Sequence, residues 1–181
     1  MGIAHPNFKI MASLPQGFPA PTPVGVIEVK QYPAYRGVTY LHQGDLTQAT
    51  RQAFNPLFQH ISSNNIAMTT PVEARYLQKS ESINQAEVSF LYSHPEITPQ
   101  QIESNVNVMD TPSMKVVSIG IQGAYTWESY QVHLQRLKNW LKQHPEYEIM
   151  GSPRRLFYHS PMTPENLKYS EVQIPIQDSL A

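Results

Sequence analysis

A motif that occurs twice constrains the fold of this 181-residue chain more than any other feature. Residues 65–77 (NIAMTTPVEARYL) run from apolar residues through methionine, two small residues and proline into a strand pattern, and residues 149–158 (IMGSPRRLFY) follow the same order. In the first copy, apolar and charged side chains alternate from Val72 to Tyr76, which predicts a strand with one buried face. We therefore expect a fold that is built from two similar halves.

The matches between the halves are separated by a slowly increasing offset, which is the effect of loop insertions in a repeat. The pairs are Gln43 and Gln122 at an offset of 79 residues, Pro71 and Pro153 at 82, and Glu87 and Glu171 at 84. Each half is predicted to run strand, strand, helix, strand, strand, and one such half cannot bury both faces of its sheet. We expect an α+β fold: two pseudo-repeated βαββ halves forming a distorted barrel or curved, mostly antiparallel sheet of about eight strands, with two helices packed on it. Strands are predicted at residues 24–31, 35–41, 72–77, 86–93, 115–121, 154–159 and 171–176.

Two amphipathic segments predict the helices. The first spans Asp45 to Ser62, with Asp45 as its N-cap, and Pro56 is expected to bend or interrupt it. Thr126 is expected to cap the second. Helical spacing on one face of the first segment is shown by Leu46, Ala49, Thr50, Ala53, Phe54, Leu57, Phe58 and Ile61. The second segment has its apolar positions at Trp127, Tyr130, Leu134, Leu137 and Leu141.

Composition excludes several classes of function. With 40% hydrophobic and 15% charged residues the chain fits a soluble globular protein, and a net charge of −1 provides no field for nucleic acid or an anionic membrane. The absence of cysteine excludes disulfides, thiolate metal sites and a cysteine nucleophile, and the seven histidines show no tight metal-ligand spacing. Residues 1–23 contain no apolar run that fits a signal peptide or a membrane span, so we expect a cytoplasmic protein.

Proline spacing places the expected domain boundaries. The prolines at positions 15, 19, 21 and 23 predict an extended lead-in over residues 1–23. A single domain is expected over residues 24–177, with halves at about 24–93 and 106–177, and a short tail over residues 178–181.

Residues 65–72 resemble the Met-Thr-x-Pro-Val signature of the SOUL haem-binding family. Residues 29–33 (VKQYP) resemble the opening strand of that family, and residues 166–172 (NLKYSEV) resemble its closing strand. The resemblance extends from about Val24 to Ile176. It implies a distorted barrel of two βαββ halves that binds haem or another tetrapyrrole reversibly.

The resemblance also implies a shallow, apolar binding surface beside the first helix and the loop before the last strand. The matching positions in this chain are Arg51, Phe54, Phe58, Gln59, Met162 and Lys168. Aromatic and thioether side chains suit a flat macrocycle, and a cation suits its propionates. For Phe54 and Phe58, packing in the core is the alternative. His60 is the candidate axial ligand of the haem iron, and an ordinary surface histidine is the alternative.

An enzymatic function is the main alternative. The doubled βαββ layout resembles GyrI-like proteins, which bind small hydrophobic molecules between their halves and sometimes hydrolyse them. Hydrolysis would need a carboxylate whose pKa is raised by an apolar cleft, and a carboxylate on a solvent-facing strand is the competing interpretation. The candidates are Glu73, Glu87 and Glu171, with Tyr76 or Tyr158 to orient water. We expect a protein that binds a tetrapyrrole or a small hydrophobic ligand, rather than an enzyme.

Overall fold

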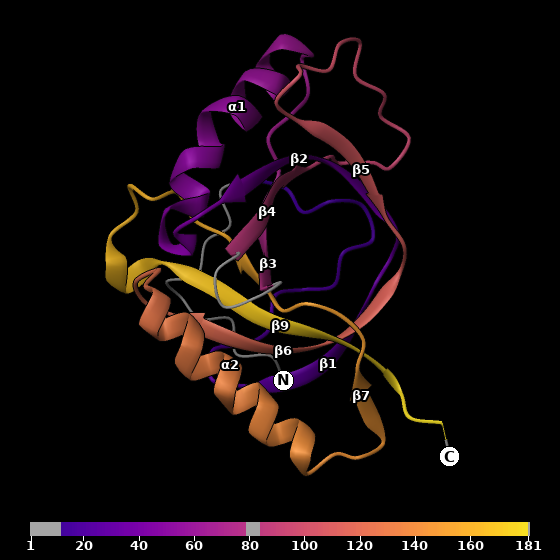
Figure 1. Cartoon of the computed structure of the whole chain (residues 1–181), viewed down its shortest axis with the longest axis vertical. Coiled ribbons are helices and arrows are strands. Elements are labelled where there is room, and N and C mark those ends of the chain that lie inside the picture. The colour runs from indigo at the N-terminus through magenta and orange to yellow at the C-terminus, as the bar shows by residue number, and fades with distance from the viewer. Residues whose placement is uncertain (1–11, 79–83, 181) are drawn as a thin grey trace.

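An antiparallel sheet with two helices on its outer face makes up the fold. The computed structural model describes residues 12–78 and 84–180. Within these residues, nine strands form one sheet that curls into a half-barrel, and two α-helices pack against it (Figure 1). The predicted α+β class is thus confirmed. The elements in chain order are β1 (Ile27–Tyr32), β2 (Tyr35–Gln43), the 3-10 turn η1 (Leu46–Gln48), α1 (Ala49–Ser63), β3 (Val72–Gln78), β4 (Asn84–Leu91), β5 (Asn107–Thr111), β6 (Met114–Gln122), α2 (Trp127–Lys142), β7 (Tyr147–Ile149), β8 (Arg154–Phe157), the 3-10 turn η2 (Glu165–Leu167) and β9 (Tyr169–Asp178).

The strand order has the same connectivity when it is read from either edge of the sheet. From one edge it runs β1-β6-β9-β8, and from the other β5-β2-β4-β3, while β7 pairs only with β9. In each series a helix follows the second strand, α2 after β6 and α1 after β2, and the pairing of β3 with β8 joins the two series. This connectivity is compatible with a duplication. The superposition of the two halves stays a prediction, because strand order alone does not establish it.

One of the three sequence matches does not relate equivalent positions. Glu87 and Glu171 both face the inside of the curl, as expected for equivalent positions. The residues that directly follow Pro71 and Pro153, in contrast, lie on opposite faces of the sheet. Val72 packs with the core under the helices, whereas Arg154 points into the curl. Because side chains alternate between the faces of a strand, a register error of one residue exchanges them. The expected equivalence of Pro71 and Pro153 is therefore wrong.

The predicted cap of α2 is confirmed, whereas Asp45 caps the 3-10 turn η1, and α1 itself begins after Gln48 without a side-chain cap. The Asp45 carboxylate accepts a hydrogen bond from the backbone N–H of Thr47 (3.0 Å) and starts η1, which leads into α1. The Thr126 hydroxyl accepts from the N–H of Ser129 (3.0 Å) and starts α2. These bonds satisfy N–H groups that the first turn of a helix leaves without a partner.

The main core lies between the sheet and the two helices. Four residues of α1 are buried there, namely Ala49, Ala53, Leu57 and Ile61, while Leu46 is half-buried. The burial predicted for Leu46, Ala53, Leu57 and Ile61 is confirmed for the last three and is only partial for Leu46. α1 continues through Pro56 without a break, so the predicted interruption is not observed. Ala53 and Leu57 lie on either side of the proline and hold both turns against the sheet.

The segment before β1 runs through the hollow of the curled sheet (indigo in Figure 1). Leu14 and Phe18 pack there against a second, smaller core that includes Tyr32 and Leu156. The backbone N–H of Gln16 also donates to the carbonyl of Ser93 (2.9 Å). From residue 12 onward, the predicted lead-in is therefore part of the domain and does not stand apart from it. Residues 1–11 lie outside the described residues.

Gly120 allows this segment to approach the sheet. A Cβ atom at this position of β6 would collide with the backbone carbonyls of Thr22 and Pro23. Only glycine leaves the space for such a close backbone approach.

Candidate functional site

α1 presents two stacked aromatic rings to solvent. Phe54 and Phe58 are 45% and 50% exposed, and their ring centroids lie 5.7 Å apart with an angle of 10° between the planes. On its inner side, Phe54 packs edge-on against the buried Phe90 (5.8 Å). The pair is thus anchored on one side and open on the other, and the alternative that both rings lie in the core is wrong. Large apolar side chains that are exposed together often mark a binding surface.

The position of the rings follows from the geometry of the helix. Phe54 and Phe58 each follow a buried residue, Ala53 and Leu57, by one position. One residue corresponds to a rotation of about 100° around a helix axis. Both rings therefore lie at the edge of the buried stripe, four residues apart, where they can stack on each other.

Arg51 and Gln59 are exposed on the same helix. Arg51 precedes Phe58 by seven residues, close to two full turns, so it projects from the same side of α1. Within the described residues, Arg51 forms no hydrogen bond or ion pair. Its charge is therefore available to an anionic group on a ligand.

The loop positions behave differently from one another. Met162, in the connection between β8 and β9, is 90% exposed. Lys168, in contrast, is buried, and its ammonium lies 5.3 Å from the centre of the Tyr125 ring. Met162 can contact a ligand at the surface, whereas Lys168 is already committed to an aromatic contact.

His60 is completely buried, and both of its ring nitrogens have partners. Nδ1 lies 2.9 Å from a carboxylate oxygen of Glu103, and Nε2 lies 2.7 Å from the hydroxyl of Tyr92. In this arrangement His60 has no nitrogen for a haem iron, and the alternative of a surface histidine is wrong as well. Its partners are 32 and 43 residues away in the sequence, so local spacing does not show this burial.

The described part of the chain contains neither a protein metal site nor a membrane-spanning helix. Across residues 12–78 and 84–180, no three His, Cys, Asp or Glu side chains are grouped so that they could hold a metal ion. The helices in these same residues are too short or too polar to cross a membrane.

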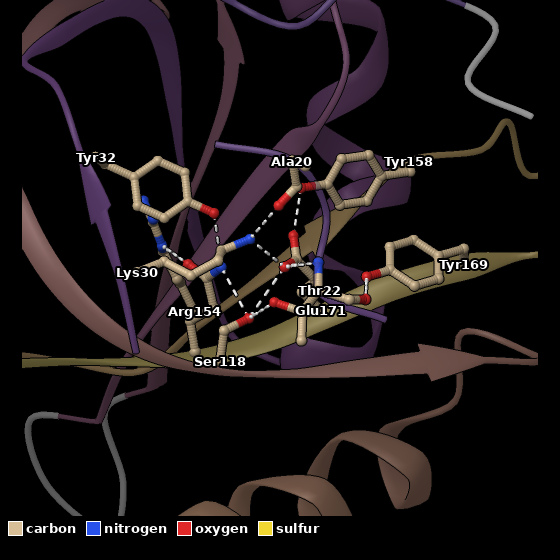
Figure 2. Close-up of polar contacts among 10 residues, drawn as sticks. Ala20, Thr22, Lys30, Tyr32, Ser118, Arg154, Tyr158, Tyr169 and Glu171 are labelled. Atoms are coloured by element: carbon tan, nitrogen blue, oxygen red, sulfur yellow. Dashed lines mark hydrogen bonds and ion pairs between the residues drawn. The ribbon is translucent and has the colours of Figure 1, made fainter. Parts of the chain in front are cut away.

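The hollow of the sheet contains a buried carboxylate in a dense polar network (Figure 2). Glu171 is inaccessible to solvent, and one of its oxygens accepts from the ammonium of Lys30 (2.7 Å), the N–H of Thr22 (2.9 Å) and the hydroxyl of Ser118 (3.0 Å). The hydroxyl of Tyr158 donates to its other oxygen. Burial alone would raise the pKa of Glu171, but the charge of Lys30 and these donors outweigh burial and hold the pKa below its ordinary value.

Glu73 is held in the same way on β3. Its carboxylate accepts from the guanidinium of Arg154 (2.5 Å) and from the hydroxyl of Tyr35 (2.8 Å). Burial would raise the pKa of Glu73, but the charges of Arg154 and Arg75 and the bond from Tyr35 lower it on balance. A general base in an apolar cleft needs the opposite shift. For Glu73 and Glu171, the predictions of a raised pKa and of a solvent-facing position are therefore both wrong.

The predicted tyrosine partners do not complete a hydrolytic site either. Tyr158 is engaged with Glu171. Tyr76 lies on the opposite face of β3 from Glu73, where its ring packs against Trp127 (5.1 Å). An odd separation along a strand places two side chains on different faces, so Glu73 and Tyr76 cannot act together. Glu87 is half-buried on the inner face.

Acid should destabilise the fold through the two buried carboxylates. The folded-state pKa values of Glu73 and Glu171 lie below the ordinary value of 4.5, so the folded state binds fewer protons than the unfolded state. Their stabilisation is complete above that value and is lost as the pH falls below it towards the lowered values. Urea unfolding at a series of pH values should show the free energy of unfolding decline below about pH 4.5. A free energy that stays constant or rises there would contradict the two ion pairs.

Comparison with known proteins supplies a family and a fold. The family model described as SOUL heme-binding protein matches residues 6–175. No curated protein sequence matches the chain. Among solved structures, the crystal structure of the EcmrR C-terminal domain has a TM-score of 0.70 at 13% identity, with 85% of this chain and 98% of that chain covered.

Two further structures share this architecture. EcmrR in its complex with DNA has a TM-score of 0.70 at 14% identity; 85% of this chain is covered, but the match spans only 58% of the EcmrR chain. A hydrolase from Listeria innocua has a TM-score of 0.61 at 12% identity, with 87% of this chain and 94% of that chain covered. At these identities the likeness shows the fold alone.

Proposed function

Because the chain belongs to the SOUL heme-binding protein family, we propose that it binds haem or another tetrapyrrole reversibly on the exposed surface of α1. The observation that carries the proposal is the stacked pair of Phe54 and Phe58, which is half exposed and has no covering element among the described residues. A macrocycle laid on these rings would gain affinity mainly from buried apolar area, at roughly 25 cal/mol per Å² before the costs of ordering.

The side chains of α1 fit a flat, anionic ligand. Phe54 and Phe58 supply an apolar contact, Arg51 would lie near a propionate, and Gln59 borders the same surface. Met162 is an exposed thioether with a flexible, unbranched side chain, which suits contact with an edge of the ring. A bound haem would supply an iron centre and a Soret band that reports its surroundings. With His60 engaged by Tyr92 and Glu103, the protein holds the ligand by surface contact, which suits a carrier or buffer that must release it.

Haemin titration of three variants tests this proposal. Phe58→Asp should nearly abolish the saturable Soret change, because it places a charge in the centre of the apolar contact. Val132→Asp is the matched control, since Val132 is equally exposed on α2 and the substitution adds the same charge. Arg51→Ala should weaken binding no more than several-fold, because an exposed ion pair is worth about 0–1 kcal/mol.

Two results would oppose the proposal. If Phe58→Asp binds haemin as tightly as the parent while its circular dichroism is unchanged, the ligand occupies another surface. If the parent shows no saturable binding, this member of the family does not take haem.

A further inference from the structure

A groove of about 310 Å³ lies between α2, η1 and the connection from β7 to β8. It shares no residue with the proposed haem surface on α1. Its volume is at the small end of the range for ligand pockets, about 300–1,000 Å³, and is too small for a whole tetrapyrrole. The lining residues that matter for recognition are Tyr76, Trp127, Tyr130, Leu134, Lys138 and Ser152.

Three aromatic side chains form one wall of the groove. The ring of Tyr130 lies 4.7 Å from that of Tyr76 and 4.8 Å from that of Trp127. The two tyrosine side chains are mostly buried, and within the described residues neither hydroxyl has a hydrogen-bond partner in the protein. The hydroxyl oxygens themselves are not among the buried unpaired atoms, and both residues line the groove, so the hydroxyls can donate to an acceptor on a ligand that displaces solvent there. Burial raises the pKa of Tyr76 to about 12, which keeps its hydroxyl protonated at neutral pH.

A cation stands at the other end of the groove. Lys138 is exposed, and in the part of the chain that the structure describes it forms no ion pair. It follows Tyr130 by eight residues on the same side of α2, a distance of about 12 Å along the helix axis. Leu134 lies between them and supplies an apolar floor.

We propose that this groove binds a small, elongated aromatic anion. The ring system of the ligand would pack against Trp127 and Leu134. An acceptor atom of the ligand would accept hydrogen bonds from the hydroxyls of Tyr76 and Tyr130, and its carboxylate would form an ion pair with Lys138. The site is a second ligand site, with a ligand class different from the tetrapyrrole proposed for α1.

Fluorescence titration with dansylglycine tests the location of the site. This probe carries an aromatic ring system, sulfonyl acceptors and a carboxylate. Ser152→Phe adds a ring at the rim of the groove and should weaken binding at least tenfold, because the space for the ligand is filled. Phe58→Asp, which alters only the α1 surface, should leave the affinity unchanged.

The uncharged amide of dansylglycine tests the chemistry. Lys138→Gln should weaken dansylglycine up to about fivefold, the equivalent of an exposed ion pair, and leave the amide unaffected. Tyr130→Phe should weaken both probes by about two- to tenfold through the loss of one hydrogen bond.

Several outcomes would overturn the assignment. The parent could show no saturable binding of dansylglycine, or Ser152→Phe could bind it with unchanged affinity. Loss of dansylglycine binding in Phe58→Asp would show that the probe binds at α1 instead. If the parent is a dimer and Ser152→Phe is a monomer, the groove is an interface with a second copy of the chain. Equal effects of Lys138→Gln on the two probes would exclude a role for charge.

Discussion

Lys30→Met is expected to lower the free energy of unfolding by about 3–5 kcal/mol, because it leaves the carboxylate of Glu171 buried without its counter-charge. The ammonium of Lys30 lies 2.7 Å from that carboxylate, and both side chains are almost fully removed from solvent. The same ammonium donates to the carbonyl of Ala20 (3.0 Å), which belongs to the segment inside the hollow (Figure 2). The substitution thus also removes a bond that holds this segment against the sheet.

The chain offers a matched control for this substitution. Lys115 forms an ion pair of similar length with Asp178 (3.0 Å), but Asp178 is largely exposed. Lys115→Met should therefore cost no more than about 1 kcal/mol. Urea unfolding followed by tryptophan fluorescence measures both values. Equal losses would mean that burial does not distinguish the two pairs.

A double variant separates the cost of the unpaired carboxylate of Glu171 from the cost of the lost contacts of Lys30. Adding Glu171→Gln to Lys30→Met removes the unpaired carboxylate and should recover part of the stability. In Lys30→Met alone, the acid loss described for the parent should be smaller, because Glu171 then lacks the charge that lowers its folded-state pKa and contributes less to that loss. If the second substitution only adds to the loss, the charge of Glu171 is not what destabilises the first variant.

Leu57→Ala is expected to cost about 2–5 kcal/mol, because it opens a cavity where α1 meets the sheet. Leu57 is inaccessible to solvent and lies in the main core. Leu41→Ala is the control: Leu41 is 42% exposed on β2, and a surface change of this kind usually costs about 0.5 kcal/mol or less. A loss below that level for Leu57→Ala would show that this face of α1 does not close the core.

Neighbouring residues of α1 should divide stability from binding. Leu57→Ala should lower the free energy of unfolding while its folded fraction still binds haemin, since the exposed rings remain. Phe58→Asp should lose haemin binding with a smaller loss in the free energy of unfolding, because Phe58 is half exposed and contributes less to the core. The free energy of unfolding and the haemin affinity are measured for both variants. Together they show whether the buried face of α1 supports stability and its exposed face supports binding.

Local patterns in the sequence determined the elements and the family. Helical spacing placed both helices, the cap of α2 lies at Thr126 as predicted, Asp45 caps the turn that leads into α1, and period-two alternation placed most strands. The Met-Thr-x-Pro-Val motif indicated the SOUL family. These features depend on residues that are close in sequence, where the geometry of one helix or strand decides which side chains share a face.

The tertiary structure alone decided which of these side chains is accessible and which is paired. His60 turns inward to Tyr92 and Glu103, Phe54 and Phe58 remain at the edge of the buried stripe, and the segment before β1 fills the hollow. Glu73 meets Arg154 across 81 residues and Glu171 meets Lys30 across 141, so both carboxylates are buried with a lowered pKa, where the sequence offered either a solvent-facing carboxylate or, for an enzyme, one with a raised pKa. Such contacts depend on the register between distant strands and on the closure of the sheet, and no periodicity within one element encodes them.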